Sequence, residues 1–123
     1  MLNKWFGMGR LTKDPEIRTT QSGKTVAVFT IAVDRDFDRD KTDFVSCTAW
    51  NKTAEFVANN FRKGKLAVVS GAWQSRKWED DKGNKRLSWE VQVDNIWFGE
   101  KKESVDVSAA DFVEISDEEE LPF

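Results

Sequence analysis

The chain has 123 residues, 39% hydrophobic and 33% charged, which suits one globular domain and includes no apolar run long enough to span a membrane. All 19 basic residues and 14 of the 22 acidic ones lie in residues 1–102, so this part carries +5, whereas residues 103–123 carry −8. With no histidine and one cysteine, the chain cannot form a histidine-based triad, an internal disulfide or a zinc cluster.

The first half of the chain is rich in β-branched and apolar runs bounded by turn residues. These runs predict strands at Leu2–Leu11, Thr25–Arg35 and Asp43–Trp50. A short extended piece is expected at Glu16–Thr19, and the polar segment Asp36–Thr42 is expected to be a loop.

One helix is predicted next, at Asn51–Lys63, with Asn51 as its N-cap and Gly64 as a left-handed stop. Its apolar residues recur at helical spacing, namely Ala54, Val57, Ala58 and Phe61. Two further strands, Leu66–Trp78 and Lys85–Phe98, are expected to form a long hairpin with a polar tip.

This order of three strands, one helix and two strands is typical of an all-β, five-stranded OB-fold Greek-key barrel with the helix between strands 3 and 4. Another five-stranded α+β sandwich would show the same order. Residues 1–102 are expected to form the domain. Residues 103–123 are expected to be a disordered acidic tail, because like charges repel and little apolar surface is present to bury.

Strand alternation places several large aromatic side chains on polar faces. In Asp43–Trp50, the small residues Val45, Cys47 and Ala49 share the face expected to be core, and aromatic residues stand at both ends of the other face. The aromatics expected to face solvent are Phe37, Phe44, Trp50 and Trp78. The basic residues expected around them are Arg10, Lys13, Arg18, Arg35, Lys52, Arg76, Lys77, Lys85 and Arg86.

Exposed rings interleaved with cations predict a surface for single-stranded nucleic acid. Unpaired bases stack on aromatic rings, and lysine or arginine side chains neutralise the phosphates. A duplex could use the cations alone, because its bases are already stacked. The other aromatics have a different prediction: Trp89 and Trp97 in the core, Trp73 in the core or an interface, and one of Trp5 and Phe6 in the core with the other at a subunit contact.

The last seven residues join charge to an apolar end. They are Asp117, Glu118, Glu119, Glu120, Leu121, Pro122 and Phe123. A tail serving solubility alone has no use for a terminal phenylalanine, whereas an apolar plug with a free carboxylate suits a pocket with a basic rim. We therefore expect this tip to bind a partner protein.

Six segments carry a family resemblance when they are taken in order. They are GRLTKDPEIR from Gly9, AVFTIAVDR from Ala27, TDFVSCTAWNKTAE from Thr42, FRKG from Phe61, SGAWQSRKW from Ser70 and DEEELPF from Asp117. With these, the chain resembles the bacterial and bacteriophage single-stranded DNA-binding proteins (SSB) of the OB-fold type over nearly its whole length.

The resemblance implies a homotetramer of OB folds that wraps single-stranded DNA, with no catalysis, cofactor or metal. It assigns base stacking to the four solvent-facing aromatics, although Phe37 and Phe44 stand where many relatives have tryptophan, which is expected to weaken stacking. It also implies that replication, repair and recombination proteins dock on the acidic tip. The short linker before the tip resembles phage-encoded members and puts linker-dependent cooperativity in doubt.

The lone Cys47 and the lack of an apolar N-terminal segment favour a cytoplasmic location, in a bacterial cell or, for a phage-encoded protein, in its host. Two other functions stay open from the residues alone. One is an RNA-binding OB module of the cold-shock type. The other is a carboxylate-dependent, metal-using nuclease.

Overall fold

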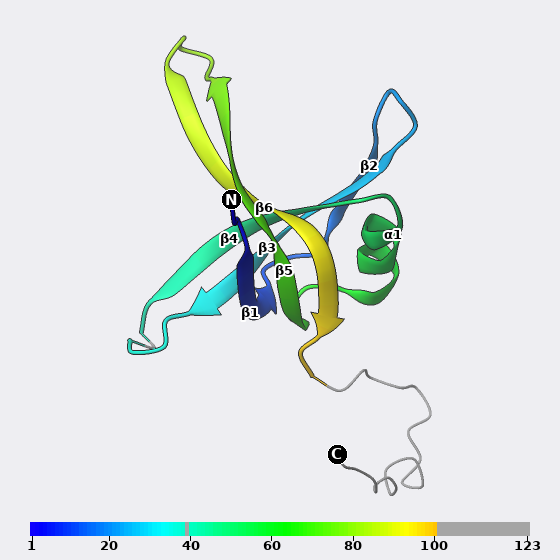
Figure 1. The fold of residues 1–123 in the computed structure, drawn as a ribbon, viewed down its shortest axis with the longest axis vertical. Coiled ribbons are helices and arrows are strands. Elements are labelled where there is room, and N and C mark those ends of the chain that lie inside the picture. The colour runs from blue at the N-terminus through cyan, green and yellow to red at the C-terminus, as the bar shows by residue number, and fades with distance from the viewer. Residues whose placement is uncertain (39, 101–123) are drawn as a thin grey trace, which may run out of the picture.

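The computed structural model describes residues 1–38 and 40–100 (Figure 1). Its elements, in chain order, are β1 (Trp5–Leu11), β2 (Glu16–Thr19), β3 (Thr25–Asp34), β4 (Thr42–Trp50), α1 (Asn51–Asn60), β5 (Leu66–Glu79) and β6 (Lys85–Phe98). The prediction of a mostly β chain with one helix after Trp50 is confirmed. Residues 103–123, where the acidic tail and the docking tip are expected, lie outside the described residues.

The strands form one sheet that closes on itself. Their order is β1-β5-β6-β4-β3-β2, and β1 pairs again with β3 through Arg10↔Ala32 and Leu11↔Ile31. Five strands therefore make a ring, and β2 is added beside β3. The piece predicted only as extended chain is thus a sixth strand. Within the ring, β4 and β6 run parallel, with Thr48 opposite Gln92.

The core lies inside the ring and beneath α1. Alternate residues of β3 and β4 point inward, among them Phe29 and Ile31 of β3 and, as expected, Cys47 and Ala49 of β4. Val33 and Val45 are only partly buried at the margin of this cluster. The helix contributes Ala54 and Val57, and Phe61 follows it into the core. The described chain has no helix of the length and hydropathy that a membrane crossing needs.

The helix differs from its prediction at both ends. Trp50, not Asn51, is the N-cap, and no side chain caps the helix. Asn51 is the first helical residue and has a φ of 54°, so a single left-handed residue turns the chain directly from β4 into α1. Asparagine tolerates that conformation better than most residues do. The helix ends at Asn60, and Gly64, with a φ of 89°, lies in the next turn.

Three tryptophans expected in or near the core are exposed instead. Trp73, Trp89 and Trp97 expose 37–49% of their surface. The β5–β6 hairpin extends beyond the ring, as the yellow-green arm in Figure 1 shows, so at Trp73 and Trp89 side-chain alternation continues where less core lies beneath it. Trp97 lies within the ring, past an irregularity in the β5–β6 register at Ser70/Gly71, which turns Ile96 instead of Trp97 into the core. Of Trp5 and Phe6, Trp5 packs against the core and Phe6 is exposed, in line with the prediction that one of the two is core.

The displaced tryptophans contact other rings. Trp73 stacks between Trp5 and Trp89, with ring centroids 6.3 Å and 5.7 Å away. Trp97 lies against Phe6 at 6.0 Å. Aromatic packing therefore covers part of each side chain that the ring of strands leaves outside.

Candidate nucleic-acid interface

One outward face of the sheet gathers three of the four aromatics predicted to stack on bases. We call it the stacking face, and it comprises Phe44, Ser46, Thr48 and Trp50 of β4, Arg86, Ser88, Glu90 and Gln92 of β6, and Gln74, Arg76 and Trp78 of β5. Two pairings create it, because Thr48 lies opposite Gln92 and Trp78 lies opposite Arg86. Alternation along each strand places the remaining members on the same side.

The aromatic rings on this face are open to solvent and two of them are held in place. Phe44, Trp50 and Trp78 expose 69%, 40% and 45% of their surface. The Trp78 indole Nε1–H donates to Ser88 Oγ at 2.6 Å, and the Trp50 Nε1–H donates to Gln92 Oε1 at 3.1 Å. Half-exposed rings with fixed edges can accept a base against their open side.

Phe37 lies apart from the stacking face. It is fully exposed in the loop between β3 and β4, beyond the last paired residues Asp34 and Thr42. At the foot of this loop Arg35 forms an ion pair with Asp43, at 3.0 Å. The sheet therefore positions three of the predicted rings, whereas Phe37 is carried by the loop.

Four of the predicted phosphate-binding residues share this outer side of the sheet. Arg76 and Arg86 lie on the stacking face beside Trp78. Val26 is the cross-strand partner of both Arg18 and Trp50, and Ala32 is the cross-strand partner of both Arg10 and Phe44. Each arginine therefore lies two strands away from its aromatic residue. Neighbouring strands are about 4.8 Å apart, so these cations lie roughly 10 Å from a ring.

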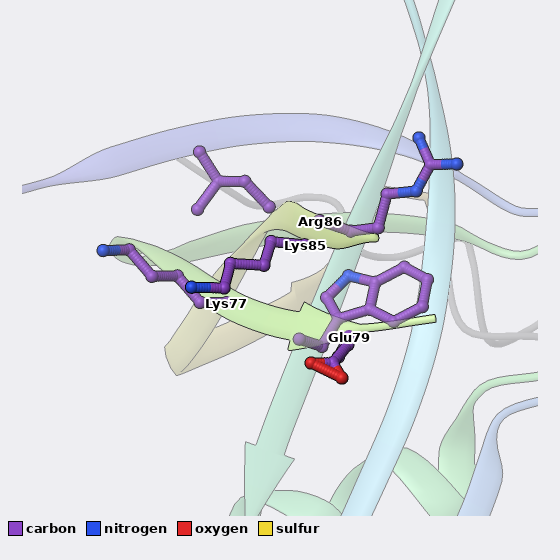
Figure 2. A pocket seen from close by; sticks show the side chains of 6 residues that line it. Lys77, Glu79, Lys85 and Arg86 are labelled. Carbon is purple, nitrogen blue, oxygen red and sulfur yellow. The ribbon is translucent and has the colours of Figure 1, made fainter. Parts of the chain in front are cut away.

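Lys77 and Lys85 occupy the other side of the hairpin. Lys77 is opposite Leu87 and Lys85 is opposite Glu79, out of phase with Trp78. Figure 2 shows the two lysine side chains extending together, away from Arg86. With Trp78, Glu79, Arg86 and Leu87 they line an open pocket of about 520 Å³ at the edge of the arm. The prediction placed these lysines around the aromatic surface, and the structure places them behind it.

The last two predicted cations stand at loop and helix positions. Lys13 follows β1 and is exposed, and Lys52 is the second residue of α1, where it borders a pocket with Thr53 and Phe56. Neither shares a strand register with Trp50. The structure therefore does not bring them onto the stacking face.

Several of the arginines are already paired with carboxylates. Arg10 pairs with Glu100, Arg18 with Glu16, Arg35 with Asp43 and Arg86 with Asp80, at 2.8–3.1 Å. The hydrogen bond from Arg35 holds the pKa of Asp43 below its usual value. Ion pairs at the surface contribute little to stability, so a phosphate group can replace the carboxylate.

Three residues of this face escaped the sequence analysis. Ser88, Glu90 and Gln92 were visible only as the polar phase of β6, opposite a tryptophan assigned to the core. Glu90 and Gln92 have their partners on β4, 42 positions away in the chain, and the parallel β4–β6 pairing brings them together, whereas Ser88 bonds to Trp78 on β5, only 10 positions away. The alternation of polar residues along β6 indicated that these three side chains share one face, but it did not indicate which strands lie beside them.

The described residues offer binding groups and little that could catalyse a reaction. Burial raises the pKa of the Cys47 thiol to about 12, with the Glu90 charge as a lesser cause, so the thiol stays protonated near neutral pH. Across residues 1–38 and 40–100, no cluster of three or more potential ligand side chains could hold a metal ion.

Comparison with known proteins gives a consistent result. The model of the Single-strand binding protein family matches residues 2–98. The chain is 44% identical over 106 residues to Single-stranded DNA-binding protein A of Bacillus subtilis, covering 83% of this chain and 62% of that protein. A Single-stranded DNA-binding protein of Caldanaerobacter subterraneus is 43% identical, over 83% of this chain and 71% of the relative. Single-stranded DNA-binding protein 1 of Staphylococcus aureus is 44% identical, over 83% and 64%.

Proposed function

Since the chain belongs to the single-strand binding protein family, we propose that it is a non-enzymatic protein that binds single-stranded DNA without sequence preference during replication, recombination and repair. The observation that carries this proposal is the stacking face, where Phe44, Trp50 and Trp78 are exposed among arginines. Stacking one base contributes about 1–3 kcal/mol and depends little on which base it is.

Phosphate neutralisation supplies the second part of the binding mechanism. Arg76, Arg86 and Arg18 flank the rings, and each phosphate that they neutralise releases condensed counterions into the solvent. By holding unpaired strands, the protein removes hairpins through mass action on the unpaired state. Phe37 and the remaining predicted cations are proposed to extend the path of the strand beyond the stacking face.

We further infer that residues 1–102 are an OB-fold domain of the five-stranded Greek-key type, followed by the acidic tail 103–123. The closed ring of five strands, the parallel β4–β6 pair and the helix between β4 and β5 support this assignment. The cytoplasm of a bacterial cell, or of a phage host, is the location that fits bacterial relatives of this kind.

A homotetramer is also part of the proposal. Phe6, Met8 and Trp97 form an exposed apolar patch, because Met8 aligns with Trp97 through Val68 and Phe6 contacts the Trp97 ring. Along the other edge of β1 runs a groove of about 620 Å³, bordered by Ala32 and Asp34 of β3. Apolar patches on soluble proteins mark interaction sites, and further copies of the chain are the proposed occupants.

The C-terminal tip Asp117–Phe123 is proposed to recruit replication, recombination and repair proteins. Its support is the sequence, in which four acidic residues precede the apolar residues Leu121, Pro122 and Phe123. Deleting these seven residues should abolish capture of such enzymes and leave DNA binding intact. Unchanged capture would contradict this part of the proposal.

Titration of the intrinsic tryptophan fluorescence with oligothymidylate at two salt concentrations tests the function, with the mass of the assembly measured in parallel. We expect oligothymidylate to quench the tryptophan emission, and we expect half-maximal quenching to require a higher DNA concentration at the higher salt concentration. Unchanged emission together with unchanged mobility of the DNA in a gel would overturn the proposal.

Two controls separate the proposed function from its alternatives. Competition between DNA and RNA oligomers of identical sequence should favour DNA, and a preference for RNA would indicate a cold-shock type of module. Labelled DNA incubated with the protein and magnesium should keep its full length. Loss of full-length strand would identify a nuclease.

A further inference from the structure

Strand β6 lies beneath both exposed indoles of the stacking face and bonds to each of them. We propose that Gln92 is a positioning residue that fixes the Trp50 ring for base stacking, and that Glu90 fixes the orientation of the Gln92 amide. This inference rests on the proposed function, since it assigns roles within the same nucleic-acid surface.

A chain of hydrogen bonds connects the three side chains. The Trp50 Nε1–H donates to Gln92 Oε1 at 3.1 Å, and Gln92 Nε2 donates to Glu90 Oε2 at 2.7 Å. Thr48 Oγ1 donates to the same Glu90 oxygen at 3.1 Å. The carboxylate is thereby held from β4 and from its own strand.

The chemistry of these groups allows one direction only. An ionised carboxylate can only accept hydrogen bonds, so the amide must turn its NH₂ group toward Glu90. The amide oxygen of Gln92 then faces Trp50, whose indole N–H can only donate. Hydrogen bonds to a charged group are roughly twice as strong as neutral ones, so Glu90 is an effective anchor for this orientation.

Trp50 needs such an anchor because of its place in the fold. It is the last residue of β4 and precedes Asn51, whose left-handed conformation turns the chain away from the sheet. A ring that swings freely would lose rotamer entropy when a base stacked on it, and that loss would weaken binding. Holding the indole edge in the unbound protein removes part of this cost.

Glu90 is otherwise difficult to explain on a surface for a polyanion. It is half-buried in the middle of the stacking face, and within residues 1–38 and 40–100 no lysine or arginine forms an ion pair with it. An uncompensated carboxylate repels phosphate. The hydrogen bonds that it accepts from Thr48 and Gln92 give it a structural role on this face.

Trp78 is held in a similar way, by a single hydrogen bond instead of a chain of them. Its indole N–H donates directly to Ser88 Oγ at 2.6 Å, two residues before Glu90 on β6. Ser88 and Gln92 thus stand four residues apart on one strand, and each accepts from a different exposed indole. Phenylalanine has no N–H, so Phe44 cannot be held in this way.

A double-mutant cycle tests the role of Gln92. Oligothymidylate affinity is measured for the wild type, Gln92→Met, Trp50→Phe and the double variant, with Gln21→Met, at an exposed position in the turn between β2 and β3, as the control outside the stacking face. In the protein with Trp50, Gln92→Met should weaken binding about three- to tenfold, the range expected for one hydrogen bond. In the Trp50→Phe variant the same substitution should leave the affinity unchanged. Equal losses in both backgrounds would overturn the proposal.

Glu90→Gln provides a nearly isosteric second variant, in case Gln92→Met perturbs folding. The new amide can donate as well as accept, so Gln92 is no longer held in one orientation. At high salt, where the charge change matters least, the variant should bind more weakly than the wild type only when Trp50 is present. Affinity at high salt that equals the wild type's, or that falls equally with Trp50→Phe, would contradict the role of Glu90.

A measurement on the unbound protein separates this inference from the proposed function. Hydrogen exchange of the Trp50 indole N–H, followed by NMR, should accelerate in Gln92→Met and Glu90→Gln while the Trp78 indole, held by Ser88, stays unchanged. Unaltered exchange at Trp50 would overturn the inference even if DNA binds. A wild-type protein that binds no DNA would instead overturn the proposed function.

Discussion

Trp50 and Trp89 are similarly exposed, at 40% and 49%, but they lie on opposite sides of the sheet. Among the described residues no aromatic ring contacts that of Trp50, whereas the Trp89 ring stacks on the Trp73 ring, with centroids 5.7 Å apart. Exposure by itself therefore does not identify a base-binding ring. The side of the sheet and the contacts of the ring decide whether a base can reach it.

Trp50→Ala is expected to weaken oligothymidylate binding by about 1–3 kcal/mol, because it removes one stacking platform. Trp89→Ala should change the affinity far less. Fluorescently labelled oligothymidylate measures both, and thermal unfolding checks that the two variants remain equally folded. The opposite order of effects would mean that the bases bind the other side of the sheet.

Cys47 is expected to resist thiol reagents in the folded protein, because only the thiolate reacts and burial raises its pKa to about 12. Since the folded pKa is higher than the unfolded value of about 8.5, the resulting stability is present below pH 8.5 and is lost progressively as the pH rises toward 12. The rate of labelling at mildly alkaline pH should follow global unfolding in urea. Rapid labelling without denaturant would contradict the burial of this thiol.

At the scale of elements, the junction between β4 and α1 depends on one residue. No loop separates the strand from the helix, and Asn51 absorbs the whole change of direction at a φ of 54°. The helix in turn places Ala54 and Val57 over the core. A change at Asn51 should therefore affect stability more than its exposed side chain suggests.

Asn51→Ala is expected to destabilise the protein by about 1–2 kcal/mol, because an alanine in the left-handed region strains its Cβ. Asn51→Gly should be tolerated better, since glycine adopts positive φ without strain. Asn59→Ala, at an exposed helical position, is the matched control and should be neutral or slightly stabilising. Urea unfolding measures all three, and an Asn51→Ala protein as stable as the wild type would refute the strain argument.

At the scale of the molecule, many of the cations predicted to bind phosphates are already paired with carboxylates. Four of the nine predicted phosphate-binding residues are in ion pairs before any ligand arrives, namely Arg10, Arg18, Arg35 and Arg86. Binding a polyanion exchanges these exposed partners for phosphates. The affinity should accordingly depend strongly on salt.

With six of the nine predicted residues engaged, the slope of log K against log salt concentration should be about −4, at roughly −0.7 per phosphate on a single strand. Arg76→Gln should make the slope shallower by about 0.7. Lys24→Gln, at the turn between β2 and β3 and outside the predicted set, is the control and should leave the slope unchanged. A flat salt dependence of the wild type would remove the phosphate contacts from the proposal.

The sequence by itself determined the order of the elements and the division of charge. Alternation in Asp43–Trp50 separated small core residues from exposed Phe44 and Trp50, because one face of that strand packs against the core from Val45 to Ala49. The same reasoning misplaced Trp89, since alternation puts it on the face of buried Val91 and does not say how far along the strand the core extends.

Only the tertiary structure decided how the faces combine. The β5–β6 hairpin extends past the ring. The face of each strand that points into the core within the ring is therefore uncovered farther along the hairpin, and Trp73 and Trp89 on that face are exposed. Ring closure and the parallel β4–β6 pair bring Trp50 to Gln92 across 42 positions of chain. Local sequence patterns do not reveal this strand pairing, because the pairing depends on how the whole sheet buries its apolar side.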